Sequence, residues 1–133
     1  MAAHLDRISD DLAAWIARQP VFFVATAPAG AGGHVNVSPK GLDSLRVLGP
    51  NRAAYLDLSG SGIETVAHLR ENGRITLMFC SFTGPPRICR LYGRGTVHPL
   101  GSAGFTDLVS HFPPLPGSRC RKGSVASSGC GMS

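Results

Sequence analysis

The sequence predicts one mainly β domain with a few short helices, arranged as a small antiparallel barrel. The chain has 133 residues, of which 43% are hydrophobic and 16% charged, enough to form a single hydrophobic core. Its apolar runs are short, and 17 glycines and 10 prolines supply turns between them. A predicted hairpin at 74–82 and 86–97 is apolar on both faces, so we expect a barrel interior on one side and a helix or second subunit on the other.

Each element follows from hydrophobic spacing and from turn residues. A helix is expected from Leu5 to Arg18, because Pro20 stops it. Two further helices are expected, one between Ser61 and Gly73 and one at 105–112. Strands are expected at 21–27, 34–38, 53–58, 75–82 and 86–97, and 45–48 is expected to be a short strand or a segment flanked by turns.

Residues 120–133 differ from the rest of the chain. They are rich in serine and glycine, with almost no apolar periodicity and little to bury. The sequence therefore predicts a folded domain at 1–119 and a disordered tail at 120–133.

Composition limits the classes of partner and the cellular compartment that we expect. The net charge of +5 favours a phosphate-bearing partner but does not choose between nucleic acid and a nucleotide cofactor. Few aromatic residues are available and no basic–aromatic stripe is visible, which disfavours nucleic acid. No apolar run is long enough for a membrane span, and the acidic N-terminus does not resemble a signal peptide, so we expect a cytoplasmic protein.

The cysteines and histidines do not indicate a metal site. None of the four cysteines forms a Cys-x-x-Cys pair, and the histidines show no ligand spacing. Cys80 and Cys89 flank the predicted hairpin turn, so we expect them to face each other as two reduced thiols. His68, on the predicted second helix, is expected to be structural or exposed and not catalytic.

The stretch Ser59-Gly60-Ser61-Gly62 leads into the second predicted helix. Ser61 is a candidate N-cap, with Glu64 as the other half of a capping box. A turn with hydroxyls and exposed N–H groups at a helix start favours an anion. The alternative is a well-capped helix with no ligand.

Several motifs together resemble the pyridoxamine 5′-phosphate oxidase-related family. They are Val-Asn-Val-Ser-Pro-Lys-Gly at 35–41, Gly-Ser-Gly-Ile-Glu-Thr at 60–65, Ala-His-Leu-Arg-Glu-Asn-Gly-Arg-Ile at 67–75, Pro-Pro-Arg-Ile at 85–88 and Leu-Tyr-Gly at 91–93. The resemblance implies an antiparallel Greek-key split β-barrel with flanking short helices. It also implies a homodimer that binds FMN at the subunit interface and acts as a flavin-dependent oxidoreductase on an unidentified small molecule.

The resemblance places the flavin phosphate against strand ends and the turn before the helix. The basic residues of the parent oxidase in that turn are replaced here by serine, glycine and glutamate, so cations must come from Lys40, Arg70, Arg74 or from Arg90 or Arg94 of the partner subunit. Lys40 is the first choice; the alternative is a solvated lysine at a strand end. The candidate cofactor-binding residues are Ser38, Lys40, Ser59, Ser61, Gly62, Thr65, Arg70 and Arg90. No catalytic residue is predicted.

Three alternatives stay open. Deazaflavin F420 can replace FMN, and the chain can be a non-catalytic module that binds a flavin, F420 or a tetrapyrrole. Relatives usually continue beyond Arg119 with a last strand and a Ser-Cys-Gly segment, of which 127–131 resembles a disturbed remnant. We therefore expect the last strand to be missing or disturbed, and a C-terminal truncation could leave the protein inactive.

Overall fold

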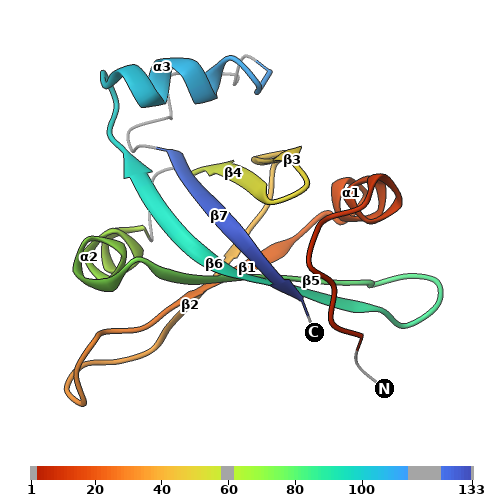
Figure 1. Cartoon of the computed structure of the whole chain (residues 1–133), viewed down its shortest axis with the longest axis horizontal. Coiled ribbons are helices and arrows are strands. Elements are labelled where there is room, and N and C mark those ends of the chain that lie inside the picture. Colours follow the sequence, from red (N-terminus) through yellow and green to blue (C-terminus); the bar gives the residue numbers. More distant parts are fainter. Residues whose placement is uncertain (1–2, 58–61, 114–123, 133) are drawn as a thin grey trace.

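Seven antiparallel strands form one sheet (Figure 1). The structure is a computed structural model, which describes residues 3–57, 62–113 and 124–132 of the chain. The strands are β1 Phe22–Thr26, β2 Asn36–Lys40, β3 Leu45–Gly49, β4 Arg52–Leu56, β5 Arg74–Cys80, β6 Ile88–His98 and β7 Ser124–Met132. Their order in the sheet is β2-β1-β5-β6-β7-β4-β3. The sheet is not closed, since β2 and β3 are its edges, and the predicted mainly β architecture is confirmed.

The sheet bends around a single main core. Phe22 and Val24 of β1 belong to the same buried cluster as Tyr55 of β4, although three strands separate β1 from β4 in the sheet. The rings of Phe22 and Tyr55 lie edge to face with centroids 5.8 Å apart. This curvature encloses the core as a barrel does, and each large side chain fully buried there contributes about 1.5–3 kcal/mol.

Three helices flank the sheet: α1 Asp10–Ala17, α2 Ile63–Asn72 and α3 Ala103–Val109. Helix α1 begins later than predicted because Ser9 caps it, accepting a hydrogen bond from Leu12 N at 3.1 Å. Helix α2 ends at Gly73, whose φ of 73° suits the left-handed C-cap. No helix in the described part of the chain has the length and apolar character that crossing a bilayer requires.

The β5–β6 hairpin pairs one residue out of the predicted register. Cys89 lies opposite Phe79, and Cys80 lies opposite Ile88, so the expected Cys80–Cys89 pair is wrong. Both cysteines are thiols, as predicted. A shift of one residue moves side chains to the other face of a sheet. Cys89 therefore faces the core with its partner Phe79, whereas Met78 and Cys80 lie on the outer face and are only partly buried.

Strand β7 corrects the prediction that the tail is disordered, and of the two alternatives for the last strand, missing or disturbed, it supports the second. Its residues pair with β4 on one side and with β6 on the other. Figure 1 shows β7 alongside β6. A register shift between Tyr92 and Arg94 interrupts the β6–β7 ladder, so this strand is disturbed but present. Two backbone ladders stabilise a strand without apolar alternation, because every peptide group is a donor and an acceptor. Residues 120–123 lie outside the described part of the chain.

Candidate functional site

A buried ion pair lies at the start of α2. Lys40 Nζ is 3.0 Å from Asp57 Oδ1, and the two side chains are 8% and 2% exposed. The second carboxylate oxygen, Asp57 Oδ2, has no hydrogen-bond partner among the described residues. The N-cap Gly62 lies against this carboxylate, since a Cβ added to Gly62 would overlap it. A carboxylate of the protein itself therefore lies beside the helix end that favours negative charge.

This geometry corrects two expectations, the solvated state of Lys40 and the N-cap role of Ser61. Lys40 is not a solvated lysine, because it is buried against Asp57. The N-cap of α2 is Gly62 and not Ser61, so the helix starts without a side-chain cap. Ser59 and Ser61 lie outside the described residues, and their contacts to a phosphate stay a prediction.

The hydroxyls of Ser38 and Thr65 lie in the interior between β2 and α2. Both residues are buried, and Asn36 Nδ2 donates to Thr65 Oγ1 at 3.0 Å and to Ser38 Oγ at 3.4 Å. A similar contact joins α2 to β1, where Thr26 Oγ1 and His68 Nδ1 are 2.9 Å apart. These hydrogen bonds attach α2 to the edge of the sheet, and the one to His68 agrees with its predicted structural role.

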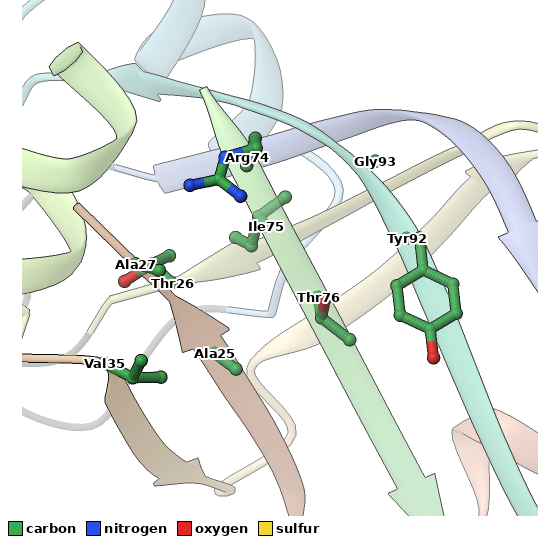
Figure 2. A pocket seen from close by; sticks show the side chains of 9 residues that line it. All are labelled: Ala25, Thr26, Ala27, Val35, Arg74, Ile75, Thr76, Tyr92 and Gly93. Atoms are coloured by element: carbon green, nitrogen blue, oxygen red, sulfur yellow. The ribbon is translucent and has the colours of Figure 1, made fainter. Parts of the chain in front are cut away.

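An open groove of about 380 Å³ lies on the outer face of the sheet, over β1, β5 and β6. The register aligns Ala25, Thr76 and Tyr92 in one row across these strands. Figure 2 shows Thr76 and Tyr92 on neighbouring strands, with Arg74 at one end of the groove. The lining consists of Ala25, Thr26, Ala27, Val35, Arg74, Ile75, Thr76, Tyr92 and Gly93. Its volume and largely apolar walls with a few polar groups are typical of sites for small organic ligands.

The four arginines that are candidates for binding the phosphate do not lie together. Arg74 and Arg94 are exposed and directly opposite each other in the β5–β6 ladder. Arg90 lies further along β6 on the outer face, opposite Met78, and is half-buried. Arg70 is exposed on α2. Of these four, only Arg74 lines the groove.

The groove was not predicted from the sequence. Ala25, Val35, Thr76 and Tyr92 come from separate segments, and only the strand register brings them together. One signal was visible: both faces of the hairpin are rich in apolar residues, which indicates that the outer face has a partner. If Cys80 paired with Cys89 as predicted, Thr76 and Tyr92 would lie on opposite faces, so that signal did not lead to the groove.

A family model for pyridoxamine 5′-phosphate oxidase matches residues 8–112. The chain is also 54% identical over 99 residues to the pyridoxamine 5′-phosphate oxidase family protein ustO of Aspergillus flavus. That match covers 73% of this chain and 39% of the relative, so the chain spans about two fifths of the length of this curated relative.

Solved structures share the fold at low sequence identity. A Lactobacillus delbrueckii protein assigned to the pyridoxamine 5′-phosphate oxidases matches with a TM-score of 0.68 and 14% identity, over 97% of this chain and 99% of its own. An FMN-binding protein of Syntrophomonas wolfei matches at 0.58 and 15%, over 84% and 74%. An F420 reductase matches at 0.57 and 13%, over 90% and 94%. At these identities the likeness shows the fold alone, a split barrel.

Proposed function

Because the chain belongs to the pyridoxamine 5′-phosphate oxidase family, we propose that it binds a phosphorylated flavin or deazaflavin in the groove over β1, β5 and β6. FMN is the first choice and F420 the alternative, since solved relatives of this fold include an FMN-binding protein and an F420 reductase. The proposed activity is an oxidoreductase reaction on an unidentified small molecule.

One observation carries this proposal: the groove combines flat, small-residue walls with a cation at one end. Ala25 and Gly93 leave room for close approach of a planar ring, and Tyr92 is 42% exposed beside them. Arg74 lies at the end of the groove, where its guanidinium suits a phosphate. These residues fit a ligand with an aromatic ring system and an anionic tail.

A bound flavin would supply hydride or electron transfer, and the protein would supply binding and orientation. Tyr92 and the small residues would hold the ring plane, and Arg74 would hold the anionic end. The described lining residues include no carboxylate, histidine or cysteine, which are among the side chains that most often transfer protons in enzymes. Any such group would come from the substrate or from a second subunit.

A second copy of the chain is the proposed cover for this open site. The outer face of the sheet carries exposed apolar side chains, including Val37, Ile88 and Tyr92, at 62%, 56% and 42% exposure. Exposed apolar surface of this kind marks interaction sites. In a homodimer, the partner would cover the ring and exclude water from it.

The same lining also favours a second candidate function, that of a non-catalytic flavin or deazaflavin carrier. A carrier needs a ring site and an anion site but no proton donor, which matches the described walls of the groove. A tetrapyrrole carrier is less favoured, because the described lining offers no histidine, cysteine or methionine as an axial ligand.

Titration of the purified protein with FMN, riboflavin and F420 tests the proposal. Quenching of ligand fluorescence at about micromolar concentration, a usual range for such ligands, is expected with FMN or F420. Absorbance and mass of any chromophore that copurifies identify the native ligand. A folded sample that binds none of the three contradicts the proposal, and reduction of a substrate by the loaded protein separates an enzyme from a carrier.

A further inference from the structure

We infer that Asn72 is a positioning residue of the groove, because its side chain sets the separation of β1 and β5 at the end of the groove where Arg74 lies. Asn72 is the last residue of α2 and does not belong to the lining of the groove. This role rests on the proposed function, since it concerns the width of the site that holds the ring of the ligand. Asn72 itself is assigned no contact with the ligand.

The β1–β5 ladder ends inside the groove. Backbone pairing between the two strands stops at Ala25 and Thr76. Two residues further on, the same register would place Ala27 opposite Arg74. All four residues line the groove, which therefore lies where the two strands separate. Strands that separate in this way leave backbone groups without a ladder partner, and those groups need another one.

The side-chain amide of Asn72 supplies both partners at this point. Its Nδ2 donates to Ala27 O at 2.8 Å, and its Oδ1 accepts from Arg74 N at 2.9 Å. The bond from Arg74 N forms an Asx turn, which fixes the direction in which the amide reaches across to β1. Neighbouring strands in a ladder lie about 4.8 Å apart, and an amide inserted between two backbones holds them further apart than that. The length of the asparagine side chain therefore sets the gap.

Two neighbouring contacts hold the same end of β1. Thr26 Oγ1 lies 2.9 Å from His68 Nδ1, and Ala29 N donates to Glu71 Oε1 at 3.1 Å. Both partners belong to α2, so the helix holds this strand end at three points. Asn72 differs from His68 and Glu71 because its side chain contacts both walls of the groove.

The width of the groove matters for a planar ring. Such a ring gains much of its binding energy from close contact with the walls, and a gap of about 0.5–1 Å forfeits about a quarter to a half of each contact. A change at Asn72 should therefore weaken binding of the ring although no group that touches the ligand is removed. The phosphate has no part in this effect, so FMN and riboflavin should be affected alike.

Fluorescence titration of Asn72 variants with riboflavin and FMN tests this role. We expect Asn72→Ala, which loses both hydrogen bonds, to bind both flavins about tenfold more weakly. Asn72→Asp keeps the acceptor for Arg74 N but loses the donor to Ala27 O, and should bind riboflavin about threefold more weakly. Riboflavin is the cleaner probe for this variant, because the added carboxylate also repels the phosphate of FMN.

Ser9→Ala is the matched control for stability. It removes the side-chain cap of α1, outside the groove lining, and should lower the melting temperature. At a temperature at which every variant is folded, Ser9→Ala should bind both flavins with wild-type affinity. Wild-type affinity in Asn72→Ala, a loss in Asn72→Ala for FMN alone, or an equal loss in Ser9→Ala would overturn the role of Asn72.

Amide NMR of the unliganded protein gives a second readout. The amide signals of Thr26, Ala27 and Ala29 should shift in Asn72→Ala and in Asn72→Asp, because both variants release Ala27 O. The same signals should stay in place in Ser9→Ala. Unshifted signals in the Asn72 variants would show that the bridge does not form. If the wild type binds neither flavin but these signals shift as expected, the proposed function fails and the bridge between β1 and β5 stands.

Discussion

Lys40 shows how the environment of one residue decides its role. Its position between Pro39 and Gly41 indicates a strand end, and strand-end lysines are usually solvated. In the folded chain it meets Asp57, 17 positions further on, and the pair is buried together. A buried lysine retains its charge at acceptable cost only when a partner compensates it. Lys40 is therefore a structural residue, whether or not a ligand also approaches it.

Lys40→Ala should destabilise the fold strongly. Removing one partner leaves Asp57 as an uncompensated buried charge, which typically costs about 3–5 kcal/mol. Urea unfolding measures the loss as a lower free energy of unfolding. Arg70→Ala, at an exposed position, should change it by less than about 0.5 kcal/mol. A Lys40→Ala variant as stable as the Arg70→Ala control would show that the buried pair does not form.

Because of Tyr55, the free energy of unfolding should depend on pH in the alkaline range. Burial raises the pKa of its phenol above the ordinary value, and the nearby carboxylate of Asp57 raises it further. Above about pH 10 the unfolded chain loses the phenolic proton, whereas the folded chain keeps it. The stability that neutral Tyr55 contributes is thus present below pH 10 and is lost as the pH rises, at about 1.4 kcal/mol per pH unit.

Tyr55→Phe should remove this pH dependence. The variant also deletes a buried hydroxyl that has no partner among the described residues, so near neutral pH it should be as stable as the wild type or up to about 1 kcal/mol more stable. Urea unfolding from about pH 8 to about pH 11.5 should show the two stabilities diverging above about pH 10. Parallel curves across that range would contradict the raised pKa.

Among the strands and helices, β7 is the element that the sequence pattern predicted least well. Strands are recognised by apolar alternation, which reports burial of side chains. Residues 124–132 lack that alternation but pair with β4 and β6 through the backbone. Without β7, the facing edges of β4 and β6 would both lack partners, and unpaired edges promote aggregation.

Removing residues 124–133 should therefore destabilise the fold strongly. We expect the melting temperature to fall by about 10 °C or more, which at this chain size corresponds to a loss of only about 3 kcal/mol, together with aggregation. A chain lacking only residues 1–4 is the control and should melt close to the wild type. Hydrogen exchange of the intact protein should show protected amides at 125–132, and rapid exchange there with an unchanged melting temperature after truncation would contradict a paired β7.

The whole molecule has one sheet face that the described chain leaves open. The main core of the protein lies on the inner side of the sheet, between β1, β4, β5 and β6. On the outer side of the sheet, Val37, Ile88 and Tyr92 are exposed. A second copy placed over this face would bury these side chains and complete the groove, as the proposed function requires.

If the proposed dimer forms through this face, Ile88→Glu should shift the chain from dimer to monomer. A charge buried in an apolar interface is left desolvated and unpaired, so we expect at least a tenfold weaker dimer in sedimentation equilibrium. Leu100→Glu is the matched control, because Leu100 is similarly exposed, at 59% against 56% for Ile88, but lies beyond the end of β6. A wild-type chain that stays monomeric at about 100 μM, or equal effects of both variants, would contradict the dimer.

The amino-acid sequence by itself determined the family and the local elements other than β7. Proline and glycine stops at Pro20 and Gly73 mark where helices end, because they act through the backbone of their own segment. Tertiary structure alone decided which residues meet: Lys40 with Asp57, Cys89 with Phe79, and Arg74 with Arg94. A one-residue slip in register reverses every side chain, and spacing along the chain does not fix register in a long hairpin. The groove, with Arg74 at one end, depends on that register, which is why only the folded sheet reveals it.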